Sequence, residues 1–318
     1  MGAAGRRGAL AVAGGIVLVL LVVSVLVGQY DLGAEGGGEM LWITRLPRTA
    51  ALMLAGCAMA VSGLVMQLLT QNKFVEPTTT GASDWAGLGL LAVTLALPTA
   101  SLPIKMLAAS AAAFAGSVVF MAMIRRVRAR DPFTVPLIGI MLGSVVGAAT
   151  TYLAVKTDYL QMITTWFMGS FTPVVRGRYE LEWIVAGVTV AVLILARRLT
   201  VAGLGRDMAT GLGLNYRATV ALGTGLVAVA TGVTTVVVGF LPFLGLVVPN
   251  LVSLRLGDDL RRALPWVALG GIGLITACDI LGRLVVAPFE VPVSLILAVI
   301  GAVVFLVVVL RWQRGRGR

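Results

Sequence analysis

The sequence contains no histidine and only two cysteines among its 318 residues. Without histidine, the chain cannot build a Ser-His-Asp triad, use imidazole as a general base or bind a metal through it. Cys57 and Cys278 both lie within apolar segments, so the sequence predicts neither a disulfide framework nor a cysteine-rich zinc site. We therefore expect no catalytic residue, no metal site and no cofactor.

Motifs that bind phosphates or magnesium are also missing. No GxxxxGK[ST] segment occurs, so the chain has no P-loop with which to bind ATP. Neither a DxxxD nor an NDxxD arrangement appears, and a magnesium-dependent prenyltransferase would need one. If this protein takes part in an ATP-driven process, the ATPase must be a separate polypeptide.

Charged residues are scarce, at 12%, whereas hydrophobic residues make up 58% of the chain. This composition excludes an ordinary soluble protein. We predict an all-α polytopic membrane protein with about ten transmembrane helices, forming a single domain over residues 1–318. The predicted spans are 9–28, 49–70, 85–97, 103–124, 133–155, 181–196, 217–238, 241–254, 263–285 and 291–310.

Two features leave the number of spans between nine and eleven. The segment 85–97 is short for a span, and the break at Gly239–Pro242 is compatible with either a kink or a loop. The first segment follows Arg6 and Arg7 and has no obvious A-x-A cleavage site. We interpret it as a retained span, with a cleaved signal peptide as the alternative.

The net charge of +11 would suggest nucleic acid as a partner in a soluble protein, but the positions of the charges argue against it. If the N-terminus is inside, 18 of the 25 basic residues fall on the inner side, which predicts that both termini are cytoplasmic. The inner set is Arg6, Arg7, Lys73, Arg125, Arg126, Arg128, Arg130, Arg197, Arg198, Arg206, Arg217, Arg255, Arg261, Arg262, Arg311, Arg314, Arg316 and Arg318; the outer set is Arg45, Arg48, Lys105, Lys156, Arg176, Arg178 and Arg283.

Asp279 is the only acidic residue deep within a predicted span, and an acid in this position is a functional candidate by default. It precedes Arg283 by four residues, so the two side chains can form an ion pair on one helix face. Arg45 and Arg48 approach the same outer side. These three guanidinium groups could receive carboxylates from a partner or an anionic substrate, or they could be interfacial anchors.

Two further patterns concern packing and the inner side. Gly139, Gly143 and Gly147 form a row at helical spacing, and Gly56 with Ala60 forms another, which predicts close helix contacts. The inner connection 197–216 is long enough for a short helix around 205–212 that exposes apolar side chains. It could dock into a groove on a cytosolic partner, or it could be a solvated turn.

Several ordered segments resemble a known family. RLPRTAALMLAGCAMAVSGLVMQLLTQNKFVEPTTTGASDWAGLGLL is similar to the first conserved block of FecCD-type permeases, which serve bacterial ABC importers of iron-siderophore, haem and cobalamin. GLGRDMATGLGL resembles the coupling segment of that family. GFLPFLGLVVPNLVSLRLGDDLRRALPWVALGGIGLITACDILGRLV and EVPVSLILAVIGAVVFLVVVLR resemble its later blocks, so the resemblance spans about residues 42–313.

The sequence departs from the family pattern at four positions. Lys73 stands where the family usually has Pro, Asn250 where it has His, Ser253 near its usual Arg, and Val303 in place of a late Pro. The segment FVEPTTTGASDWA resembles the catecholate-siderophore branch more closely than the cobalamin branch.

The resemblance implies a type II ABC importer permease fold and roles for three groups of residues. Arg45, Arg48 and Arg283 would dock an extracytoplasmic substrate-binding protein. The segment 199–215 would be the coupling element on the ATPase, carried by Gly205, Arg206, Asp207, Met208, Ala209, Leu212 and Gly213. The second and fifth spans would line a translocation path between two permease subunits, with Met66, Gln67, Met141 and Ser144 as lining residues.

We therefore expect the permease subunit of an ATP-driven importer in the bacterial cytoplasmic (inner) membrane. Its partners would be ATPase subunits, a binding protein, a second identical or homologous permease, an iron-siderophore complex and the lipid bilayer, and not nucleic acid. A cobalamin or haem permease is the alternative within the family. A polytopic membrane enzyme and an ATP-independent secondary carrier are the alternatives from other classes.

Overall fold

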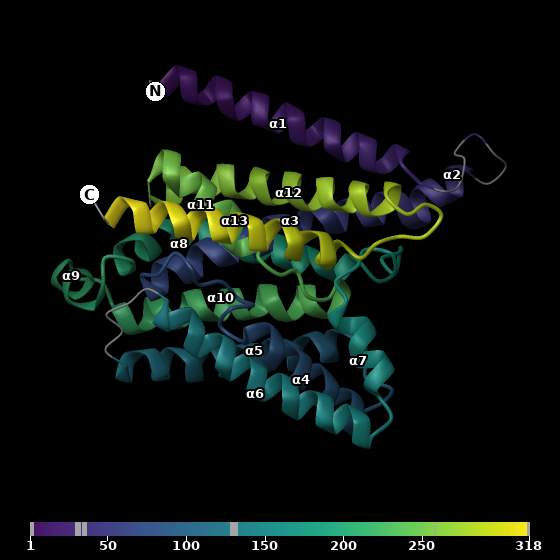
Figure 1. Ribbon diagram of the computed structural model, residues 1–318, viewed down its shortest axis with the longest axis horizontal. Coiled ribbons are helices and arrows are strands. Elements are labelled where there is room, and N and C mark those ends of the chain that lie inside the picture. The colour runs from purple at the N-terminus through teal and green to yellow at the C-terminus, as the bar shows by residue number, and fades with distance from the viewer. Residues whose placement is uncertain (1–2, 29–32, 34–36, 128–132, 258, 317–318) are drawn as a thin grey trace.

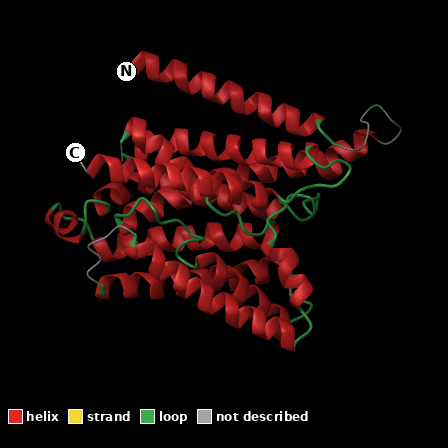
Figure 2. Ribbon diagram, viewed as in Figure 1, coloured by secondary structure: helices red, strands yellow, loops and turns green. Residues whose placement is uncertain are grey.

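The computed structural model describes residues 3–28, 33, 37–127, 133–257 and 259–316, and the regular secondary structure in these ranges is helical (Figure 2). Of the basic residues assigned to the inner side, Arg128, Arg130 and Arg318 fall outside these ranges. Among the described residues, seven helices are long and apolar enough to cross a membrane, and three further apolar helices are shorter. The prediction of an all-α fold with about ten membrane helices is confirmed.

The ten apolar helices follow the predicted spans closely. They are α1 (Ala3–Leu26), α3 (Leu46–Thr70), α4 (Ala82–Ala96), α5 (Leu102–Arg126), α6 (Thr134–Lys156), α8 (Trp183–Ala202), α10 (Tyr216–Val237), α11 (Leu244–Leu256), α12 (Leu260–Leu284) and α13 (Val293–Arg316). Short elements join them: α2 (Gly37–Met40), the π-helical turn η1 (Leu41–Arg45), α7 (Leu160–Phe167), the 3₁₀ turn η2 (Glu180–Glu182) and α9 (Arg206–Gly211).

The break between α10 and α11 is a true interruption. Gly239 and Phe243 both have positive φ angles, +98° and +62°, so the backbone cannot continue as one helix through this segment. The result is two apolar helices of 22 and 13 residues where the sequence left a kink and a loop equally open.

The long helices run roughly along one axis, with α9 and both chain ends at one end of the bundle and α2 and α7 at the other (Figure 1). Helix α3 lies at the centre, where it packs against α8, α10, α11 and α12, while α1 lies at one side against α12. Helices α4, α5 and α10 pack against one another, and α6 covers α4. Most of the core side chains therefore gather around α3.

Close backbone contacts hold the centre together, as the glycine spacing predicted. A Cβ atom at Gly56 would lie 2.9 Å from the carbonyl oxygen of Gly271, and one at Gly63 would lie only 1.9 Å from that of Gly245. Helices α12 and α11 can approach α3 this closely only because glycine stands on both sides.

Residues 71–81, between α3 and α4, fold back into the bundle instead of forming a surface loop. Glu76 is fully buried, and its Oε1 accepts a hydrogen bond of 2.8 Å from the backbone N–H of Phe243, at the start of α11. Asn250 Nδ2 of α11 donates to the carbonyl of Lys73 at 2.8 Å. These contacts satisfy polar groups of a non-helical segment inside protein, as a membrane protein requires.

Candidate functional site

At the α2 and α7 end of the bundle, which the distribution of basic residues predicts to be the outer end, Asp279 of α12 joins two arginines. Its Oδ1 lies 2.7 Å from Nη2 of Arg48 on α3, and its Oδ2 lies 2.7 Å from Nη2 of Arg283, one turn further along α12. The ion pair that the i, i+4 spacing predicted is therefore present, and Arg48 is a second partner. The Asp279 carboxylate is fully buried, so two cations and hydrogen bonds replace the water it has lost.

Two of the arginines also hold the end of α1. Arg45 Nη1 donates to the carbonyls of Val25 and Leu26, both at 2.8 Å. Arg283 Nη1 donates to the carbonyls of Ser24 and Val27, at 2.9 and 2.6 Å. The last carbonyls of a helix have no partner within it and carry partial negative charge, so guanidinium groups stabilise this terminus.

Glu290, in the segment between α12 and α13, extends the network towards solvent. Arg48 Nη1 donates to both of its carboxylate oxygens, at 3.1 and 3.0 Å, and Thr172 Oγ1 donates to Oε2 at 2.6 Å. Partial burial by itself would raise the pKa of the Glu290 carboxyl, but the hydrogen bond from Thr172 and the charge of Arg48 together hold it below its usual value. Glu290 is therefore ionised at neutral pH.

The structure thus brings Arg45, Arg48 and Arg283 together, as the sequence analysis expected, and gives their guanidinium groups partners within the chain. The side chains are 86% or more buried. Sequence reasoning did not identify Glu290 or the α1 carbonyls as their partners, because no spacing along the chain relates α1, α3 and the segment after α12.

The expected coupling segment forms a short helix, α9, that projects from the opposite, inner end of the bundle (Figure 1). Met208 and Leu212 expose 62% and 67% of their surface, whereas Ala209 is fully buried against the bundle. Arg206 and Asp207 are exposed in the first turn. Gly205 and Gly213 flank the helix with φ angles of +96° and +80°, a conformation that favours glycine.

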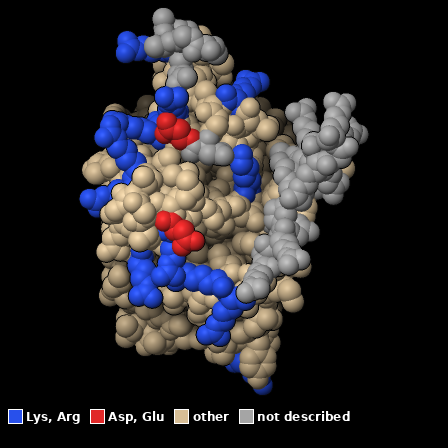
Figure 3. All heavy atoms as spheres, turned by 90° about the vertical axis from the view of Figure 1, so that its left-hand side faces the viewer, with Lys and Arg blue, Asp and Glu red and all other residues tan. Residues whose placement is uncertain are grey.

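The inner end is also strongly basic. Figure 3 views this end and shows that Lys and Arg side chains outnumber Asp and Glu on it. The exposed arginines among the described residues here are Arg7, Arg125, Arg126, Arg197, Arg198, Arg206, Arg217, Arg255, Arg261 and Arg262.

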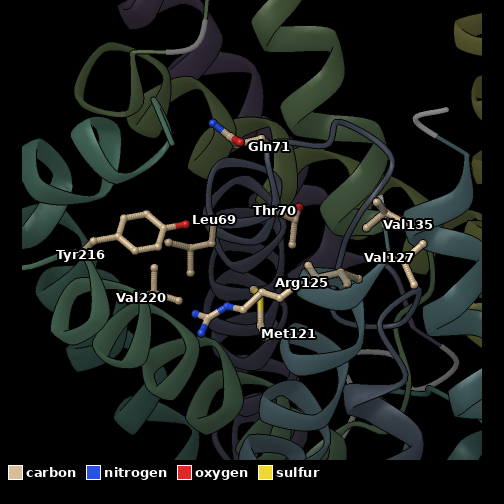
Figure 4. A pocket seen from close by; sticks show the side chains of 10 residues that line it. Leu69, Thr70, Gln71, Met121, Arg125, Val127, Val135, Tyr216 and Val220 are labelled. Atoms are coloured by element: carbon tan, nitrogen blue, oxygen red, sulfur yellow. The ribbon is translucent and has the colours of Figure 1, made fainter. Parts of the chain in front are cut away.

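A cavity of about 260 Å³ lies at this end between α3, α5 and α10. Leu69, Thr70 and Gln71 line it from the end of α3, and Tyr216 lines it from the start of α10 (Figure 4). The side chain of Arg125 reaches across it from α5 towards α10. Because Gln71 also donates to the carbonyl of Gly203, this cavity adjoins the segment that leads into α9.

The four expected path residues do not share one surface. Met66 is fully buried in α3, and Gln67 Nε2 donates to the carbonyl of Gly245 at 3.3 Å, so both face neighbouring helices. On α6, by contrast, Met141 exposes 62% of its surface and Ser144 is also exposed. Only the α6 pair therefore lies on an accessible face of this chain, because neighbouring helices cover Met66 and Gln67.

The expectation that Asp279 is the only acid deep within a span was wrong. Asp84 lies in the first turn of α4, which begins three residues before the predicted segment, and Glu182 is fully buried where η2 leads into α8. Hydropathy assigned Asp84 to the connection before the span 85–97 and Glu182 to the edge of the span 181–196, and no sequence pattern marks either side chain as buried. Among the described residues, no group of three or more acidic or cysteine side chains is placed to hold a metal ion.

The fold and these elements correspond to a known family. The FecCD transport family model matches residues 11–311, and the chain belongs to this family. The chain is 52% identical, over 95% of its length and 90% of the relative, to the petrobactin import system permease protein FatD of Bacillus anthracis. It is 42% identical to the ferric-anguibactin transport system permease protein FatD of Vibrio anguillarum, over 86% of this chain and 88% of that one.

More distant relatives and solved structures agree on the architecture. The vitamin B12 import system permease protein BtuC of Escherichia coli is 32% identical over 94% of both chains. An inward-facing metal-chelate type ABC transporter superposes with a TM-score of 0.82 at 22% identity, covering 96% of this chain and 99% of that one. The chain is thus a multi-pass membrane protein with the fold of an ABC importer permease.

The outer network predicts a large effect of a single isosteric change. Asp279→Asn should lower the free energy of unfolding by about 3–5 kcal/mol, because it leaves two buried guanidinium groups without their shared carboxylate. Thermal unfolding of the detergent-solubilised protein measures this effect. Asp207→Asn, which removes the same charge from exposed α9, is the control and should unfold like the wild type. Equal stability of the two variants would contradict the structural role of Asp279.

Proposed function

We propose that this protein is the membrane-spanning permease subunit of an ATP-driven importer for iron-siderophore complexes. The observation that carries the proposal is the 52% identity, over nearly the whole chain, to a permease named for petrobactin import. A second relative named for ferric-anguibactin transport supports the same class of substrate. Cobalamin and haem are the secondary candidates, since permeases named for vitamin B12 and hemin transport are 32% and 33% identical.

In this proposal the α9 end of the bundle faces the cytoplasm, together with both chain termini. The basic inner end supports this orientation, because positively charged segments are retained on the cytoplasmic side during insertion. The protein acts in the cytoplasmic membrane of a bacterium as a pair of permease subunits, either identical or homologous. Two ATPase subunits supply the energy, and ATP binding shifts the coupling segments and alternates access to a central path.

Uptake measurements test the substrate. Deletion of the gene in its native host should abolish energy-dependent uptake of ⁵⁵Fe supplied as a ferric siderophore, and a plasmid copy should restore it. Cobalamin and haem uptake, measured in the same strains, should not change. Loss of cobalamin or haem uptake with normal siderophore uptake would replace the proposed substrate by that alternative.

The coupling role is assigned to α9 and its flanking residues, Gly205 to Leu214. Exposed Met208 and Leu212 form an apolar surface that protrudes from a basic face, and burial of such a surface in a groove of the ATPase would stabilise the complex. Buried Ala209 and the two positive-φ glycines fix the helix on the bundle, so that a movement of α9 is passed on to α8 and α10.

One substitution separates this role from a general effect of charge. Leu212→Asp should abolish co-purification of the ATPase, because it places a carboxylate in the apolar contact. Asn215→Asp adds the same charge three residues away and keeps an oxygen to cap α10 at Ala218, so it should leave the complex intact. Normal ATPase recovery with Leu212→Asp would show that the contact lies elsewhere.

The docking role is assigned to the outer arginine network of Arg45, Arg48 and Arg283. In this network Arg48 faces the carboxylates of Asp279 and Glu290, and Arg283 shares Asp279 with it. Arg48 is the arginine whose partner, Glu290, reaches the solvent, since the Glu290 side chain is 25% exposed. An acidic side chain of a binding protein can therefore compete with Glu290 for Arg48. Arg45 and Arg283 would instead support the site by binding the carbonyls at the end of α1.

Neutral variants distinguish docking from folding. Arg48→Gln should weaken binding of the substrate-binding protein about tenfold, since it removes the charge that a partner carboxylate would meet. Lys105→Gln removes one charge from the outer end of α5 and should bind like the wild type. Surface plasmon resonance on nanodisc-embedded importer measures both. An unchanged affinity for a well-folded Arg48→Gln variant would exclude Arg48 from the interface.

A further inference from the structure

We propose that the Asp84 carboxylate faces the aqueous translocation path near the middle of the membrane and favours passage of substrates that carry positive charge. This inference rests on the proposed function in one respect, namely that the exposed face of α6 lines that path. Hydropathy placed Asp84 in the connection before the predicted span 85–97, whereas the inference assigns it to the path.

The position of Asp84 follows from its contacts with α6. A Cβ atom at Gly143 would lie 2.6 Å from Asp84 Oδ2, and one at Gly147 would lie 3.5 Å from Oδ1. Gly143 and Gly147 are the tenth and fourteenth of the 23 residues of α6, so the carboxylate lies beside the middle of this span. Residues 71–81 fold back into the bundle, and this places the start of α4 at that depth.

The glycine row of α6 leaves the space that the Asp84 carboxylate occupies. A Cβ atom at Gly143 would also lie 3.1 Å from the Cα atom of Gly81, and one at Gly139 would lie 2.1 Å from the carbonyl oxygen of Thr79. Any larger side chain on α6 would therefore push the start of α4 away. The row allows close helix contact, as expected, and it also leaves room for a charged group between two membrane helices.

Asp84 differs from the other acids within the bundle in its partners. Asp279 has two arginines, Glu76 accepts a hydrogen bond from the Phe243 backbone, and Glu182 accepts one from Thr234. For Asp84, by contrast, no ion pair with a described Lys or Arg is present, and its side chain is partly exposed. Asp84 is thus the partly exposed acid of these four, since Asp279, Glu76 and Glu182 are all buried.

Exposure at this depth indicates water rather than lipid. A carboxylate turned towards hydrocarbon at mid-span costs several kcal/mol, so intramembrane acids face a bundle interior or a water-filled cavity. Ile140 and Ser144, one turn apart beside the glycine row of α6, are both exposed. The surface beside Asp84 is therefore the aqueous one.

A single carboxylate in such a passage has a defined effect on charged solutes. Between low-dielectric walls it attracts cations and repels anions more strongly than it would in bulk water. The ligand class it favours is therefore a metal chelate that carries an ammonium group, as opposed to one that carries a free carboxylate.

Thiol labelling tests the inference without a transport substrate. In the assembled importer, Ser144→Cys should react with small membrane-impermeant methanethiosulfonates, and a cationic reagent should react about tenfold faster, relative to its rate with a free thiol, than an anionic one. Adding Asp84→Asn should remove this preference, whereas Asp84→Glu should keep it. Asp158→Asn, which removes an exposed charge at the outer end of α6 and suits the positive φ of that residue, should also keep it.

Labelling of the parent chain, which retains Cys57 and Cys278, gives the background rate, and ATPase activity of each complex confirms its assembly. Absence of labelling at position 144 would overturn the aqueous face, and an unchanged preference with Asp84→Asn would overturn the electrostatic role. Both results are independent of siderophore uptake, which alone decides the proposed function. In uptake assays, Asp84→Asn should slow an ammonium-bearing ferric chelate about tenfold relative to a carboxylate-bearing one.

Discussion

The buried carboxylate of Asp279 is the interaction on which the outer half of this structure depends. It lies between Arg48 and Arg283, and these side chains connect α3, α12, Glu290 and the end of α1. A guanidinium group buried without a partner is costly, and so is a lone carboxylate. Each member therefore stabilises the position of the next, and four separate parts of the chain are held at one end of the bundle.

The same requirement, that polar groups find partners away from water, explains the inner architecture. Residues 71–81 enter the bundle as a series of turns, and Glu76 and Asn250 bind that segment to α11. The break at Gly239–Phe243 leaves the backbone N–H of Phe243 without a helical partner, and Glu76 accepts a hydrogen bond from it. The irregular segment and the interrupted helix thus provide hydrogen-bond partners for each other in the centre of the protein.

Hydropathy predicted the ten apolar helices well, because each requires a long apolar segment and nothing else. It could not predict that 71–84 lies within the bundle, since the polar residues of that segment are typical of a loop. The spacing of Asp279 and Arg283 predicted their ion pair, but Arg48 is 231 residues from Asp279 and no local pattern connects them. The exposed spacing of Met208 and Leu212 indicated α9 correctly, whereas Met66 gave no sign of being enclosed by four helices. The sequence thus predicted contacts within one helix, but it did not predict contacts between segments that are distant along the chain.

The anchoring of α1 bears on how the protein is made. Arg283 follows Ser24 by 259 residues, and its two hydrogen bonds to the carbonyls of Ser24 and Val27 are among the few polar contacts of this helix. During synthesis the first helix enters the membrane long before Arg283 leaves the ribosome. The two bonds from Arg283 can therefore form only when the ninth of the ten apolar helices has been inserted, so the anchoring of α1 that Arg45 begins early is completed only near the end of synthesis.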